Sequence, residues 1–151
     1  MTNRQYGYAD STITVNLDAI VANWQFLDSL SAPSTKTAAM VKANGYGLDS
    51  GAVATALAAA GCALFFVASL GEAIELRRHF NKVGINEMPI MVLHGAQIGQ
   101  EDTLAANQLV PVLNDLEQIS RWRLFADKTG MKLPALPIVL AVCWARITIS
   151  K

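Results

Sequence analysis

Short apolar runs alternate with longer amphipathic segments along most of the chain. The apolar runs have the length of strands and lack the regular polar positions of a half-exposed sheet. They predict strands at residues 37–42, 63–68, 88–95 and 109–113. The segments between them carry helical spacing or are rich in alanine, which predicts helices at residues 17–30, 50–60, 70–79, about 100–107 and about 115–128.

The helix starts have local signals of their own. Asn16 precedes an apolar stripe at helical spacing and is the expected N-cap. Ser69 and Glu72 have the spacing of a capping box, and Asn114 with Glu117 gives a second one. The stripe that follows Asn16 consists of Leu17, Ile20, Val21, Trp24, Leu27 and Leu30. Before it, the alternating β-branched residues at 12–16 predict one further strand.

Strands that alternate with helices and are apolar on both faces indicate a parallel sheet covered by crossover helices. A (β/α)8 barrel has about 250 residues, so 151 residues would hold four to five of its strands. A doubly wound sheet would fit the length better, but no GxGxxG fingerprint follows the first strand. The pattern therefore indicates an α/β fold and leaves a partial TIM-type barrel and a doubly wound sheet both open.

Composition and charge narrow the functional classes. A hydrophobic content of 52% argues against disorder, and 12 basic residues balance 12 acidic ones, which disfavours nucleic-acid binding. Cys62 and Cys143 are far apart, as in a reducing compartment. The N-terminus does not resemble a signal peptide, and the apolar run at 133–149 contains two prolines and Arg146. We expect a cytoplasmic protein with no membrane partner.

The stretch AAMVKANGYG, residues 38–47, places Lys42 at the end of an apolar strand. In parallel α/β folds the chemistry gathers at the carboxyl ends of strands, and a poorly hydrated lysine there can act as a nucleophilic amine. Lys42 shares a strand face with Ala38 and Met40. The glycines after it allow a tight turn, and Asn44 can fix that turn. A lysine after a strand is usually a solvated charge at the strand end, and only the neighbouring residues favour a chemical role for Lys42.

The motif MVKANGYG closely resembles the cofactor-lysine motif of alanine racemases, and its flanks resemble the same family from residue 12 to 128. The resemblance implies an α/β fold that is the N-terminal half of a (β/α)8 TIM-type barrel, with pyridoxal 5'-phosphate as the cofactor. It implies that Lys42 binds the cofactor covalently and serves as one of two acid/base groups. Tyr46 matches a position beside the cofactor near its phosphate, and Leu93 matches a residue lining the pocket, although a plain core leucine is nearly as good a description. Leu48 and Asp49 stand where many members have His-Gly.

The resemblance also implies the biological role. The family interconverts L-alanine and D-alanine for peptidoglycan and is homodimeric. Its second acid/base group is a tyrosine of the partner subunit's C-terminal β-domain, so we expect no normal turnover from this chain alone. No second ligand accompanies His79 or His94 at metal spacing, and no metal is expected.

After about residue 138 the resemblance stops, which suggests a truncation or a frameshift. We expect residues 1–151 to form one incomplete domain. Its strand at 12–16 would belong with the C-terminal β-domain, its barrel units would span 37–138, and 139–151 would be an atypical tail. Two alternatives stay open: a non-catalytic pyridoxal-phosphate-binding pseudoenzyme, and an unrelated α/β binding module in which Lys42 is a surface residue.

Overall fold

The computed structural model describes residues 13–137 and consists of helices and strands in alternation. The strands are β1 (Ala39–Met40), β2 (Phe65–Val67), β3 (Ile90–Val92), β4 (Val110–Leu113) and β5 (Leu136–Pro137). The helices are α1 (Leu17–Ser29), α2 (Lys42–Tyr46), α3 (Ser50–Ala59), α4 (Leu70–Lys82), α5 (Glu101–Ala106) and α6 (Leu116–Thr129). The four strands and five helices predicted between residues 17 and 128 are therefore confirmed, with shorter strands than predicted.

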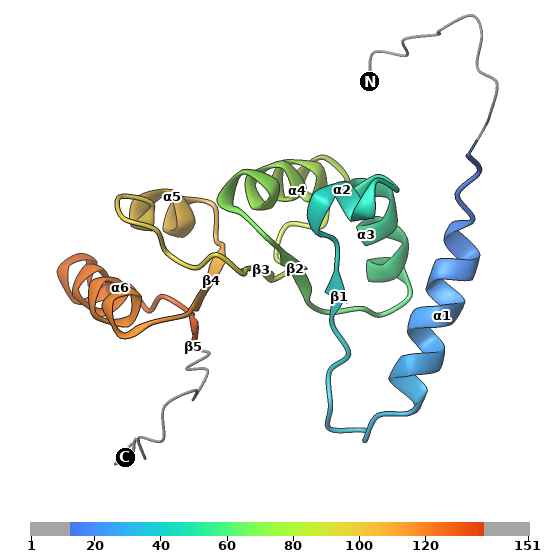
Figure 1. The fold of residues 1–151 in the computed structure, drawn as a ribbon, viewed down its shortest axis with the longest axis horizontal. Helices are drawn as coiled ribbons and strands as arrows, with labels where there is room; N and C mark the ends of the chain where they lie inside the picture. Colours follow the sequence, from blue (N-terminus) through green and yellow to red (C-terminus); the bar gives the residue numbers. More distant parts are fainter. Residues whose placement is uncertain (1–12, 138–151) are drawn as a thin grey trace, which may run out of the picture.

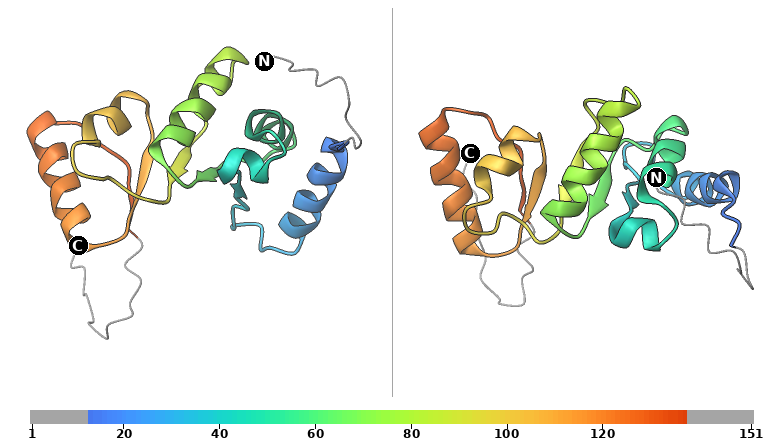
Figure 2. Two further views of the ribbon diagram at one scale, coloured as in Figure 1. Left: turned by 45° about the horizontal axis from the view of Figure 1, so that its top comes forward. Right: turned by 90° about the horizontal axis from the view of Figure 1, so that it is seen from above.

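The strand order identifies the fold. The five strands form one sheet in the order β1-β2-β3-β4-β5, and every neighbouring pair is parallel. The helices follow the strands as an outer arc from α1 to α6 (Figure 1), which the rotated views also show (Figure 2). A doubly wound sheet reverses its order and has helices on both faces. The partial TIM-type barrel is confirmed, and the doubly wound alternative is wrong.

The core lies between the sheet and the helical arc. Ala39 and Val41, like Phe65 and Val67, are buried on the face that meets the helices. Met40, between the first two, is exposed on the opposite, inner face. This alternation agrees with the predicted inner-face position of Met40. Lys42 lies beyond the end of β1, after the non-extended Val41, so its place on the inner face stays a prediction.

Two of the three expected helix caps form as predicted. The Asn16 side chain accepts a hydrogen bond from Ala19 N at 3.0 Å, and Ser69 caps α4. The third prediction is wrong by one residue, because Asp115 caps α6 and accepts from Gln118 N at 2.7 Å. Asn114 does not cap this helix, since its side chain instead donates hydrogen bonds to the ends of two strands.

The N-terminal segment differs from its prediction in two respects. Residues 13–16 form no strand, and Ile13 and Val15 are exposed. The reason is that a strand needs a partner for its backbone groups, and no described segment supplies one. The stripe of α1 is buried only in part. Its first four residues pack against the core, whereas Leu27 and Leu30 are exposed where α1 continues past α3 (Figure 1).

Two remaining expectations concern the limits of the domain and the membrane. The predicted tail at 139–151 and the first residue of the strand at 12–16 lie outside the described residues, so the domain assignment stays a prediction. Between residues 13 and 137, every helix is too short or too polar to cross a lipid bilayer.

Candidate active site

The sheet register brings Lys42 and Leu93 to the same edge of the sheet. Met40 pairs with Phe66, and Val67 pairs with Val92. When the register is continued past the strand ends, Lys42 is level with Ala68, and Ala68 is level with Leu93. Neighbouring strands are about 4.8 Å apart, and β1 and β3 are two such spacings apart, so the Lys42 and Leu93 backbones are separated by roughly 10 Å. Both predicted residues therefore lie at the carboxyl ends of the strands.

Lys42 leads directly into a left-handed turn. Five successive residues have positive φ: Ala43 (51°), Asn44 (53°), Gly45 (64°), Tyr46 (57°) and Gly47 (84°). Two internal hydrogen bonds of 2.9 Å close the turn, from Gly45 N to Val41 O and from Gly47 N to Ala43 O. This conformation costs about 1–2 kcal/mol for each residue other than glycine. Three such residues in a row of five mark a strained segment, which is a frequent feature of active sites.

Side chains on both sides of the turn hold it in place. Asn44 Oδ1 accepts hydrogen bonds from Ser50 N at 3.0 Å and from Ser50 Oγ at 3.3 Å. Gly45 is buried, and a Cβ atom on it would lie 3.1 Å from Ser50 Cα. The predicted role of Asn44 in fixing the turn is confirmed. The sequence predicted a glycine-rich turn, but not that Ala43 and Tyr46 would adopt the left-handed conformation as well.

Glu72 makes a contact that the sequence did not reveal. Its Oε1 accepts a hydrogen bond from Ala43 N at 3.0 Å, and its Oε2 accepts one from Ala68 N at 2.8 Å. The capping box is thus only half formed. Ser69 Oγ accepts from Glu72 N at 3.4 Å, but the Glu72 carboxylate accepts from Ala68 N where a complete capping box would have it accept from Ser69 N. One carboxylate joins the residues that follow β1 and β2.

A similar connection joins the ends of β3 and β4. Asn114 Nδ2 donates to Leu93 O at 2.8 Å and to Val112 O at 3.0 Å. Gln118 is buried; its Oε1 accepts from Asn114 N at 3.2 Å and its Nε2 donates to His94 O at 3.5 Å. Neither residue was predicted to belong to this rim, because the helix-start pattern gives no information about neighbouring strands.

The predicted site residues differ in their surroundings. Lys42 is half-buried, and in the described part of the chain no carboxylate forms an ion pair with it. Leu93 is half-buried on the same row, while the side chain of Tyr46 is 61% exposed. His94 follows β3 and is exposed. Lys42 and Leu93 therefore lie at the same rim of the sheet, and Tyr46 belongs to the turn beside it.

The remaining histidine and the depressions of the surface lie elsewhere. His79 Nε2 is 2.9 Å from Thr55 Oγ1, between α4 and α3 on the outer side of the sheet. Between residues 13 and 137, no three His, Cys, Asp or Glu side chains come together as a metal site requires. An open depression of about 580 Å³ lies at the amino ends of β2 and β3, lined by Ala63 and residues 84–89. It is at the opposite end of the strands from Lys42.

The sequence and fold of this chain have counterparts among known proteins. The chain matches the family model described as alanine racemase, N-terminal domain, over residues 15–140. The chain belongs to this alanine racemase family. It is 42% identical over 128 residues to alanine racemase of Brucella ovis, a match that covers 85% of this chain and 31% of that protein.

Solved structures agree with the family assignment. Alanine racemase from Bartonella henselae, whose structure contains covalently bound pyridoxal phosphate, is 36% identical with a TM-score of 0.72. That match covers 80% of this chain and 32% of the other. Alanine racemase from Bacillus anthracis with bound L-Ala-P is 30% identical with a TM-score of 0.67, covering 80% of this chain and 30% of the other. The chain thus spans about a third of the alanine racemases that it matches.

Proposed function

We propose that this chain is the cofactor-binding part of an alanine racemase and that Lys42 binds pyridoxal 5'-phosphate covalently. The observation that supports this is the position of Lys42. It is half-buried, forms no ion pair with a described carboxylate, and lies just beyond the carboxyl end of β1. A relative that is 36% identical holds the cofactor covalently. The reaction would interconvert L-alanine and D-alanine for peptidoglycan synthesis.

The residues at the rim fit such a cofactor. A carbonyl group condenses with a free amine, and no described carboxylate is paired with the Lys42 amine. When bound, pyridoxal phosphate serves as an electron sink that stabilises negative charge at the substrate α-carbon. Lys42 would hold the cofactor and later take up or return the α-proton at its Nζ atom. Leu93 would line the pocket, and Tyr46 would contact the cofactor from the turn.

Complete racemisation needs a second acid/base group on the opposite face of the substrate. In the family this group comes from the C-terminal domain of a partner subunit, whereas the match here is to the N-terminal domain. We therefore propose that the 151-residue chain binds the cofactor but does not racemise alanine unless a C-terminal domain is supplied. A homodimeric assembly and a location in the bacterial cytoplasm belong to the same proposal.

The first experiment locates the cofactor. The chain is incubated with pyridoxal phosphate, reduced with borohydride and digested, and the labelled peptide is identified by mass spectrometry. We expect the label on Lys42 and a visible absorbance band that is lost in Lys42→Ala. Lys36→Ala is the matched control, because Lys36 is an exposed lysine six residues earlier and its removal should leave both signals unchanged. Label on another lysine, or no label, would overturn the assignment.

The second experiment separates an enzyme part from a pseudoenzyme. The chain is loaded with pyridoxal phosphate but not reduced. It is then incubated with L-alanine, alone and with the separately produced C-terminal domain of a relative, and D-alanine is measured by chiral chromatography. We expect no D-alanine from the chain alone and measurable D-alanine from the mixture. Full turnover by the chain alone would refute the need for a second domain. Cofactor binding without turnover in the mixture would favour the pseudoenzyme.

A further inference from the structure

We infer that Glu72 is a positioning residue for Lys42, and that its carboxylate sets the direction in which the lysine leaves the strand. This inference rests on the proposed function for the role of Lys42, but the geometry is independent of it. Glu72 is on α4, whereas Lys42 follows β1, so the connection runs between two successive βα units. The structure shows the connection as two hydrogen bonds from one carboxylate.

The two hydrogen bonds converge from different strand ends. Ala43 N and Ala68 N are both donors, and each carboxylate oxygen of Glu72 accepts one of them, at 3.0 and 2.8 Å. Hydrogen bonds to a charged acceptor are stronger than those between neutral groups. The carboxylate also lies in the first turn of α4, where the helix dipole favours a negative charge. The two hydrogen bonds and the helix N-terminus thus fix the position of the Glu72 carboxylate, which can in turn restrain the backbone of the turn.

The bond to Ala43 N acts directly on Lys42 through the peptide plane. The Ala43 N–H belongs to the rigid unit that begins at Lys42 Cα, so holding that N–H fixes the ψ angle of Lys42. Ala43 is also the first of the five residues with positive φ. Strained backbone of this kind persists only where its surroundings determine it. Asn44 holds the far side of the turn through Ser50, and Glu72 holds the side next to the lysine.

Gln118 offers an internal comparison. It occupies the same third helical position in α6 that Glu72 occupies in α4, and it also connects to the end of the preceding strand. Its two partners are one donor, Asn114 N, and one acceptor, His94 O. An amide, with one oxygen and one NH2, matches that pair. Glu72 faces two donors, and a carboxylate offers each of them an acceptor oxygen of its own. The residue type at each position follows the polarity of its partners.

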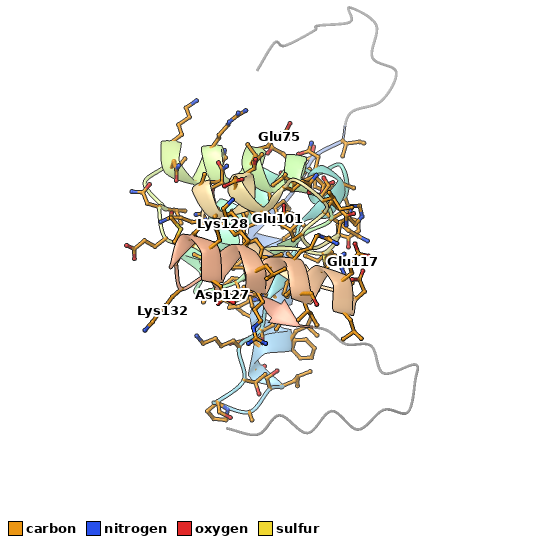
Figure 3. The ribbon with its side chains drawn as sticks, turned by 90° about the vertical axis from the view of Figure 1, so that its left-hand side faces the viewer. Glu75, Glu101, Glu117, Asp127, Lys128 and Lys132 are labelled. Atoms are coloured by element: carbon orange, nitrogen blue, oxygen red, sulfur yellow. The ribbon has the colours of Figure 1, made fainter. Side chains whose placement is uncertain are left out.

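The test compares Glu72→Gln with Glu75→Gln. Both remove one negative charge from α4, but Glu75 is exposed on its surface (Figure 3). In Glu72→Gln the new NH2 group must face one of the two backbone N–H donors. We expect hydrogen exchange at the Ala43 amide to accelerate about tenfold, the factor that corresponds to ~1.4 kcal/mol. We also expect the ratio of borohydride-trapped pyridoxal phosphate on Lys42 to that on Lys36 to fall several-fold. Glu75→Gln should change neither.

A purely structural role is tested by Ser69→Ala and Gln118→Glu. The first weakens the cap of α4 and the second disturbs the rim between β3 and β4, but both leave the Glu72 carboxylate in place. We expect both to lower the free energy of unfolding without changing the Lys42 to Lys36 ratio. Equal ratios in Glu72→Gln and wild type, or an equal fall in Ser69→Ala, would overturn the inference. If Lys42 of the wild type is not trapped at all, the proposed function fails, while amide exchange at Ala43 still tests the hold of Glu72 on the turn.

Discussion

At the scale of single residues, the site depends on contacts whose partners are distant in sequence. The spacing of Ser69 and Glu72 predicted a helix start, and the helix does start there. The same spacing could not show that the Glu72 carboxylate accepts from Ala43, because that contact exists only once β1 and β2 are adjacent. Lys42 itself was predictable from its motif. The residues that hold it were not, because their pattern is satisfied by any ordinary helix N-terminus.

Gly95 makes a residue-scale prediction at the other part of the rim. It has φ +74°, and a Cβ atom would lie 2.5 Å from Val112 O and collide with the Gln118 side chain. Gly95→Ala should therefore lower the free energy of unfolding by more than the ~1 kcal/mol expected for a positive φ alone. Gly84→Ala is the matched control, since Gly84 has φ +82° and open space around it. Urea denaturation of both variants measures the difference, and equal losses would show that the steric contact is unimportant.

At the scale of elements, the caps and the apolar periodicity predicted where helices and strands form. Their boundaries followed within a few residues, because these signals are local. The turn after Lys42 is an exception. Its glycines indicated a tight turn, but Ala43 and Tyr46 have no intrinsic preference for positive φ. Glu72 holds Ala43 N and Ser50 holds the Asn44 side chain. Glu72 lies far from this segment in the sequence, so the segment alone could not show how the turn is held.

Arg77 connects elements at the amino ends of the strands. It is 4% exposed, and burial lowers its pKa below the ordinary value of an arginine. Its guanidinium donates hydrogen bonds of 2.9–3.1 Å to four backbone carbonyl oxygens, which belong to Asn86, Met88, Asn107 and Gln108. These carbonyls lie in the segments that lead into β3 and β4. In the sequence Arg77 was part of a polar helix end, and nothing there indicated a buried cation.

Replacing Arg77 should separate these segments. Arg77→Met keeps much of the side-chain volume but removes the buried donor that four backbone carbonyls share, and we expect a loss of about 3–5 kcal/mol in the free energy of unfolding. Arg78→Met is the control, because Arg78 is the exposed neighbour on the same helix. Arg77→Lys should fall between the two, since an ammonium group cannot reach four acceptors in a fork. A loss in Arg77→Met no larger than that in Arg78→Met would contradict this role.

At the scale of the whole molecule, the sequence left the barrel and the doubly wound sheet open. Both consist of the same alternating elements, and they differ in the order of strands that are 20 or more residues apart. The observed order β1 to β5 decides between them. It also explains the site, because a curved sheet in sequential order places the ends of β1 and β2 next to each other. Glu72 can then reach across from the unit that follows Lys42.

Cys62 provides a prediction for the stability of the molecule as a whole. Its side chain is 1% exposed in the core beneath α3, and desolvation raises the pKa of its thiol. Below a pH of about 8.5 the thiol is protonated in both the folded and the unfolded chain. As the pH rises above that value, the unfolded chain loses the proton first and is stabilised relative to the folded one. The free energy of unfolding should therefore decrease as the pH rises toward the folded pKa of Cys62.

The contribution of Cys62 is measured as the difference between two variants that differ only at this residue. Urea denaturation is compared at pH 7.5 and pH 10 for Cys143→Ser and for Cys143→Ser with Cys62→Ala. Every other titrating group is common to the two proteins, so the excess loss of stability in the first belongs to Cys62. We expect that excess to be positive, and the folded Cys143→Ser protein to react with a thiol reagent only as fast as it opens. Identical losses in the two proteins would mean that Cys62 ionises as easily inside the fold as outside it.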